Sequence, residues 1–158
     1  METVKHKQIS EEEVIIMNRE DYMKLKEMID KMKFKSAKVK SGSFSQTAVS
    51  RMCNYIASLV ANASTKAELR DPNGNLIKTF TSLNELAVDV ESDKVYLRVR
   101  IIDNSTDSYT FRYLKIWERY GDSDETCVYH TFSQNYTKGS DQIADIKVRT
   151  GIGGCYLG

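Results

Sequence analysis

The ten residues Lys94-Val-Tyr-Leu-Arg-Val-Arg-Ile-Ile-Asp103 decide the fold class of this chain. Every second residue from Val95 to Ile101 is aliphatic, whereas Arg98 and Arg100 stand among the residues between them. A period of two places the aliphatic side chains on one face of an extended strand, which is typical of a strand that is buried on one side. The stretch therefore predicts a β-strand with one face in a core.

Similar short strands are expected on both sides of this stretch. The turn Asp71-Pro-Asn-Gly-Asn75 predicts a hairpin, because Pro72 fixes φ and Gly74 can adopt the left-handed conformation. Further strands are expected at 66–70, 76–80, 85–90, 109–119, 126–132 and 142–150. About seven to eight strands at this spacing predict a mainly β fold, an antiparallel, jelly-roll-like β-sandwich with an N-terminal helical arm.

The first third of the chain has a different organisation. After the apolar residues 14–17, which we expect to form a short strand, Asn18 is a suitable N-cap for a helix with Glu20 and Asp21 in its first turn. Four residues of this helix recur at a/d-like spacing, namely Tyr22, Leu25, Ile29 and Met32. Two heptads are too short for a free coiled coil. The stripe is therefore expected either to pack on the chain's own sandwich or to contact another subunit.

A Ser- and Lys-rich stretch at 35–46 predicts a linker after this helix. We therefore expect an N-terminal arm over residues 1–45, made of the short strand, the helix and the Lys-rich linker. The main body would span residues 46–158 and begin with an amphipathic helix at 47–63, whose apolar stripe is expected to lie in the core or in an interface.

Five lysines lie close together with no acidic residue between them: Lys31, Lys33, Lys35, Lys38 and Lys40. The net charge of the whole chain is only +1, so the positive charge of these lysines is a local feature. The run is either a solvated connector or a contact for a polyanion, such as genomic nucleic acid, or for an acidic protein surface. Only Phe34 and Phe44 accompany it, so the run does not predict stacking of single-stranded bases.

The sequence contains no recognisable cluster of candidate catalytic residues. His6 and His130 are the only histidines, and neither has a Ser or Cys nearby in a nucleophile arrangement. The acidic residues at 122–125 lack the Gly and the distal Glu of an EF-hand loop, so we interpret them as a solvated turn. We expect a protein that is not an enzyme and has no catalytic, cofactor or metal site.

The remaining motifs concern covalent chemistry and membranes. Cys53, Cys127 and Cys155 are widely spaced, which indicates neither a disulfide framework nor a metal pair. A Cys127–Cys155 bridge and three reduced thiols both remain open. Asn104 and Asn135 each begin an Asn-x-Ser/Thr pattern in or beside an expected surface turn, so glycosylation there is a hypothesis. No window holds the ~20 apolar residues of a membrane span, so none is expected.

The order of these elements resembles a group of viral proteins. The resemblance rests on the helix at 48–63, on Lys66-Ala-Glu-Leu-Arg-Asp-Pro-Asn-Gly-Asn-Leu-Ile-Lys-Thr-Phe80, on strands around 107–111, and on the closing strand Asp141-Gln-Ile-Ala-Asp-Ile-Lys-Val148. Over residues 45–150 the chain is similar to small β-sandwich or jelly-roll virion structural proteins of archaeal viruses and some phages. The resemblance implies a capsid or tail subunit of the virion, with copies of itself and other virion proteins as partners.

Two other functions are compatible with the sequence. A carbohydrate- or ligand-binding β-sandwich module would use exposed aromatic rings, for which the candidates are Tyr109, Tyr113, Trp117 and Tyr129. Core packing or cross-strand pairing is the alternative for those rings. A DNA-binding protein would use the lysines from Lys31 to Lys40, with an affinity that falls steeply with salt. A binding module should be a monomer with a flat aromatic strip, whereas a shell subunit should bury the rings or place them against another copy.

Overall fold

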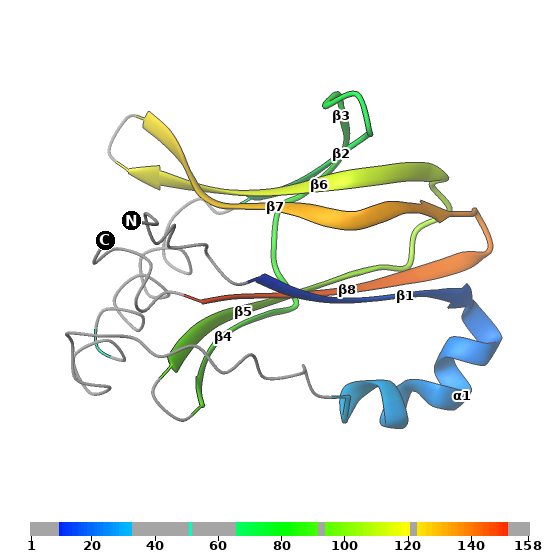
Figure 1. The fold of residues 1–158 in the computed structure, drawn as a ribbon. Helices are drawn as coiled ribbons and strands as arrows, with labels where there is room; N and C mark the ends of the chain where they lie inside the picture. The colour runs from blue at the N-terminus through cyan, green and yellow to red at the C-terminus, as the bar shows by residue number, and fades with distance from the viewer. Residues whose placement is uncertain (1–9, 33–50, 52–65, 92–93, 121–122, 152–158) are drawn as a thin grey trace, which may run out of the picture.

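The computed structural model of this chain is mainly β, and it describes residues 10–32, 51, 66–91, 94–120 and 123–151. Two antiparallel sheets of four strands each pack face to face, and a helix lies beside them (Figure 1). This arrangement confirms the expected antiparallel β-sandwich. The strand orders do not confirm the jelly-roll arrangement.

We call the two sheets sheet A and sheet B. Sheet A has the strand order β1-β8-β5-β4, and sheet B has the order β3-β2-β6-β7. The strands of sheet A are β1 (Ser10–Asn18), β4 (Glu85–Glu91), β5 (Lys94–Asp103) and β8 (Gln142–Gly151). Those of sheet B are β2 (Lys66–Arg70), β3 (Leu76–Phe80), β6 (Tyr109–Tyr120) and β7 (Ser123–Lys138).

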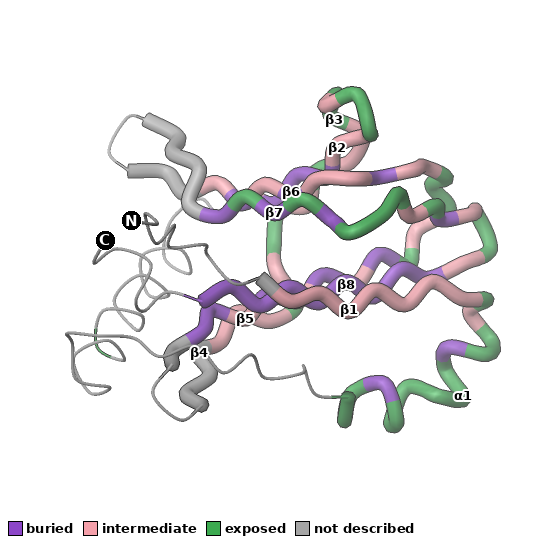
Figure 2. The backbone as a smooth tube through the Cα atoms, viewed as in Figure 1, coloured by how far each residue is buried: buried purple, intermediate pink, exposed green. Residues whose placement is uncertain are grey.

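The core lies between the two sheets and follows from the alternation of side chains along each strand. In β5, Leu97, Val99 and Ile101 are buried in the main core cluster together with residues of sheet B such as Leu69 and Leu114. In sheet A, most of the residues that Figure 2 colours as buried belong to the inner strands β5 and β8. The residues between the core positions of β5 therefore lie on the outer face of sheet A.

Local signals place the turn and the helix start where the sequence predicts them. Gly74, in the turn between β2 and β3, has a φ of +88°. Asn18 accepts a hydrogen bond from the backbone N–H of Glu20 at 2.9 Å, which caps helix α1 (Arg19–Asp30). The side chain thus satisfies one of the backbone donors that a helix N-terminus leaves free.

The short strand expected in the N-terminal arm is β1, and it forms an edge of sheet A. It pairs with β8 along its whole length, from Ser10 opposite Thr150 to Asn18 opposite Gln142. The boundary predicted at residue 45 lies outside the described residues. So do four of the five lysines of the basic run, Lys33, Lys35, Lys38 and Lys40, and all of the predicted helix at 47–63 except residue 51.

Candidate functional site

The four residues of α1 that the sequence predicts as one interface lie on two different surfaces of the helix. Tyr22 and Ile29 are buried against Ile143, with Ile102 nearby, and these two sheet residues lie on the outer face of sheet A. Leu25 and Met32 instead are 43% and 45% exposed. Met28, which is 70% exposed, lies at helical spacing from both. We call the exposed set of Leu25, Met28 and Met32 the α1 stripe.

A buried carboxylate holds α1 to sheet A. Asp145 of β8 accepts a hydrogen bond from the Tyr22 hydroxyl at 2.8 Å and two from the Arg100 guanidinium at 2.6 and 2.9 Å. Arg100 also binds Asp30 at the end of α1, at 2.6 Å. Burial and the bond to Asp145 raise the pKa of Tyr22 to about 12. The network therefore fixes the helix on the sheet from both of its ends.

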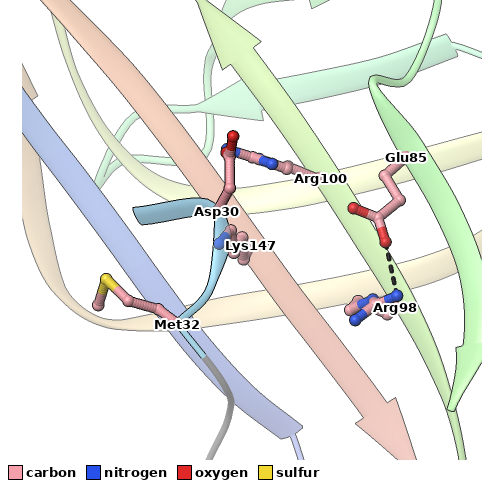
Figure 3. A pocket seen from close by; sticks show the side chains of 6 residues that line it. All are labelled: Asp30, Met32, Glu85, Arg98, Arg100 and Lys147. Carbon is pink, nitrogen blue, oxygen red and sulfur yellow. Dashed lines mark hydrogen bonds and ion pairs between the residues drawn. The ribbon is translucent and has the colours of Figure 1, made fainter. Parts of the chain in front are cut away.

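A polar pocket of about 210 Å³ lies where the end of α1 meets the outer face of sheet A (Figure 3). Its lining residues are Asp30, Met32, Glu85, Arg98, Arg100 and Lys147. Lys147 donates to the carbonyl of Ile29 at 2.7 Å, and Arg98 pairs with Glu85 at 2.6 Å. Because each basic side chain of the pocket already contacts a protein acceptor, we interpret the pocket as part of the joint between helix and sheet.

The outer face of sheet B brings aromatic and basic side chains together. Residues on this face alternate with core residues such as Ala67, Leu114 and Ile116, so they point away from the core. In the register of the sheet, Lys66 is opposite Trp117, Arg70 is opposite Tyr113, and Lys115 is opposite Tyr129. We call these six residues the sheet B platform.

The rings and cations of the sheet B platform contact one another. The Lys115 ammonium lies 5.5 Å from the ring centroids of both Trp117 and Tyr129, and the Lys66 ammonium lies 5.7 Å from that of Trp117. The rings of Tyr113 and Tyr129 stack with centroids 6.0 Å apart. Tyr129 is 51% exposed. The platform is thus a partly exposed surface on which rings and positive charges alternate.

Glu68 is the buried anchor beneath this surface. Its Oε1 accepts a hydrogen bond from the Trp117 indole N–H at 2.7 Å and another from Arg70 at 2.9 Å. Burial alone would raise the pKa of Glu68, but the bonds from Trp117 and Arg70 outweigh it and lower the pKa. The carboxylate stays ionised and fixes the orientation of one ring and one cation of the platform.

The structure separates Tyr109 from the three other rings that the sequence proposes as a ligand strip. Tyr109 packs against the core ring of Phe111, and its hydroxyl donates to Asp103 at 2.5 Å. Burial raises the pKa of Tyr109 above its usual range. Sequence reasoning did not include Lys66, Arg70 and Lys115, although their alternation with core residues along β2 and β6 is a signal that could have found them.

The other predicted contact residues lie elsewhere. Lys31 is exposed beyond the end of α1 and pairs with Glu27 at 3.3 Å. Asn104 is exposed just after β5. Asn135 is also exposed but lies within the edge strand β7 and not in a turn, and it accepts a hydrogen bond from Arg112 at 3.3 Å. The three cysteine side chains lie outside the described part of the chain.

His130 lies inside the sandwich and takes part in a contact between the sheets. Its Nε2 is 3.1 Å from a carboxylate oxygen of Glu12 in β1. Glu12 also accepts from the backbone and hydroxyl of Ser133 and from the hydroxyl of Tyr136. Burial lowers the pKa of His130, although Glu12 favours its charged form. These contacts connect the edge strands β1 and β7 across the sandwich.

The described residues hold neither a metal-binding cluster nor a membrane-spanning helix. No group of three His, Cys, Asp or Glu side chains in the described ranges is placed to hold a metal ion. No helix in the part of the chain that the structure describes is long and apolar enough to cross a membrane. Comparison with protein-family models, with curated proteins and with solved structures finds no match to this chain.

Proposed function

We propose that this protein is a structural subunit of a virion, either of the capsid or of the tail, and that it acts by self-assembly without catalysing a reaction. The observation that carries the proposal is the α1 stripe, an exposed apolar surface on a helix that is itself fixed to the sandwich. The viral assignment is supported by the resemblance of residues 45–150. The proposal does not depend on jelly-roll connectivity.

The α1 stripe has the properties of a contact between copies. Methionine side chains adapt to irregular partner surfaces, and an exposed apolar surface bordered by charged residues is typical of an interaction site. The stripe is bordered by both signs of charge, because Lys24 pairs with Glu20 and Lys31 pairs with Glu27 along the helix. Two copies related by a twofold axis can place the same stripe against itself and exchange these charges.

The edges of the sandwich offer a second means of joining subunits. Among the described strands, β1 and β4 flank sheet A, and β3 and β7 flank sheet B. An edge strand has backbone groups without partners in its own sheet, and an assembly can cover them with a segment from a neighbouring copy. Edges and stripe together provide contacts in more than one direction, as a shell or tube requires.

The test is the mass of the purified protein in solution by light scattering, across concentration and at low and high salt. We expect defined oligomers or larger particles for the wild-type chain. Met28→Lys should shift the distribution towards the monomer, because it places a charge within the apolar contact. Met23→Lys is the matched control, since Met23 is exposed on the same helix but outside the α1 stripe. A strict monomer of the wild-type chain under every condition would contradict the proposal.

A further inference from the structure

The sheet B platform combines two kinds of contact within a few residues. Tyr113, Trp117 and Tyr129 supply ring faces, and a lysine ammonium lies beside two of these rings. A ligand on this surface could therefore stack an aromatic group on a ring while an anionic group meets the neighbouring cation. Single-stranded nucleic acid carries a base and a phosphate in each repeating unit, so it fits both contacts.

We propose that the outer face of sheet B binds single-stranded nucleic acid, with bases on the platform rings and phosphates at Lys66 and Lys115. This binding goes beyond the assembly role and uses other residues. It also differs in place from the basic run at Lys31 to Lys40, which the sequence suggests for DNA.

Charge selects the class of ligand. The platform has three basic side chains, of which Arg70 is paired with buried Glu68. The other two, Lys66 and Lys115, lie beside the rings. Among the described side chains of this surface, the three cations outnumber the one carboxylate, Glu68. A neutral sugar could stack on the rings but would gain nothing from the charge of the two lysines. A polyanion gains from both.

The rings select a single strand over a duplex. In a duplex the bases are stacked on one another, and their faces are not available to protein side chains. An unpaired strand can lay its bases on a flat sheet face, and stacking on an aromatic ring tolerates any base. The partly buried hydrogen bond between Trp117 and Glu68 holds one ring in place before a ligand arrives, which lowers the entropic cost of binding.

The position of the platform leaves it accessible in an assembly. Sheet A lies between α1 and sheet B in Figure 1, so the α1 stripe and the platform are on opposite faces of the sandwich. A contact between copies through α1 would not cover the outer face of sheet B. A shell subunit could in this way bind its neighbours on one face and a nucleic-acid strand on the other.

The experiment uses the full chain and its single tryptophan, which is Trp117 in the platform. Labelled strands of about 12 nucleotides, a length within the usual site size, are titrated and followed by anisotropy and by quenching of Trp117 fluorescence. The probes are oligothymidylate, oligouridylate, an abasic strand of equal length, a duplex, and a neutral β-glucan oligosaccharide. We expect both single strands to bind and to quench Trp117, and their ratio of affinities then distinguishes DNA from RNA.

Variants separate stacking from charge. Tyr129→Ala should weaken binding about tenfold, because stacking of one base on one ring contributes on that order. Tyr129→Leu, which keeps an apolar side chain but removes the ring, should weaken it similarly. Lys115→Gln should reduce the salt dependence of the affinity by about one phosphate contact, a slope change of about 0.7 for a single strand. Lys26→Gln, at an exposed position on α1, is the charge-matched control and should change neither quantity.

Four outcomes would overturn the proposal. They are absence of binding and quenching at low salt, equal affinity for the abasic strand, preference for the duplex or the neutral oligosaccharide, and no effect of either Tyr129 variant. The thermal unfolding midpoint of each variant shows whether it is folded. If Tyr129→Ala does not fold, Tyr129→Leu and Lys115→Gln decide the question.

Discussion

His130 and Glu12 show how one residue pair can make the stability of the sandwich depend on pH. His130 is buried, and its contact with Glu12 connects sheet B to the edge strand of sheet A. Burial lowers the pKa of His130 in the folded protein, so the imidazole is neutral there at pH values at which a free histidine would begin to take up a proton. The unfolded chain therefore binds more protons below the ordinary histidine pKa of about 6.5.

We expect the free energy of unfolding to decrease as the pH falls below about 6.5, until the lowered pKa of folded His130 is reached. The variant His130→Gln removes this titration, so its stability should change less between about pH 5 and pH 6.5. Urea unfolding across this range measures both slopes. The range lies above the usual pKa values of carboxylic acids, which limits their contribution. Equal slopes for wild type and variant would contradict this account of His130.

At the scale of elements, α1 is fixed to sheet A by a small number of polar contacts around a buried carboxylate. Tyr22, Arg100 and Asp30 all take part in the network around Asp145, whose side chain has no solvent-exposed surface. The periodicity of the helix predicted one apolar stripe of Tyr22, Leu25, Ile29 and Met32. It did not show that Tyr22 and Ile29 turn towards the sheet while Leu25 and Met32 remain exposed, because that division depends on where the sheet lies.

Asp145→Asn should destabilise the protein by about 3 kcal/mol, because it removes the charge that Arg100 meets in a buried position. Asp30→Asn is the matched control. Asp30 binds the same guanidinium, but its side chain is 40% exposed, so the expected loss is under about 1 kcal/mol. Chemical denaturation of the two variants measures the difference. Similar losses for both would show that Asp145 does not have the special position assigned to it.

At the scale of the whole molecule, the sandwich separates two proposed surfaces. The α1 stripe lies on the sheet A side, and the sheet B platform lies on the other. The two surfaces share no residue and are separated by the core. Their functions should therefore be independent in a folded monomer, because mutations at distant sites without shared partners have nearly additive effects.

This independence gives a prediction for the Met28→Lys variant. It should lose self-association but bind oligothymidylate with an affinity within about twofold of wild type, when each chain is counted as one site. Light scattering and anisotropy on the same sample measure both properties. A large loss of binding in a folded monomeric variant would show that the nucleic-acid site requires more than one copy.

The candidate surfaces could be predicted from the sequence only in part. The rings of Tyr113, Trp117 and Tyr129 could be named from the sequence, but core packing or cross-strand pairing was the alternative for each of them. Tyr109 could not be separated from them, because its burial depends on Asp103 and on the core ring of Phe111. The cations of the platform come from β2 and β6, and their approach to the rings depends on a pairing of strands that are far apart in the chain.

The sequence by itself determined the local structure of this protein. Alternation fixed the strand at 94–103 and its inward face, Gly74 fixed a turn, and Asn18 fixed the start of α1. These features depend on neighbours within a few residues, where steric and hydrogen-bonding preferences are sufficient. Only the tertiary structure decided that β1 joins β8 and that the rings and cations of sheet B form one surface. Those contacts join distant segments, and the burial of the whole core selects their register.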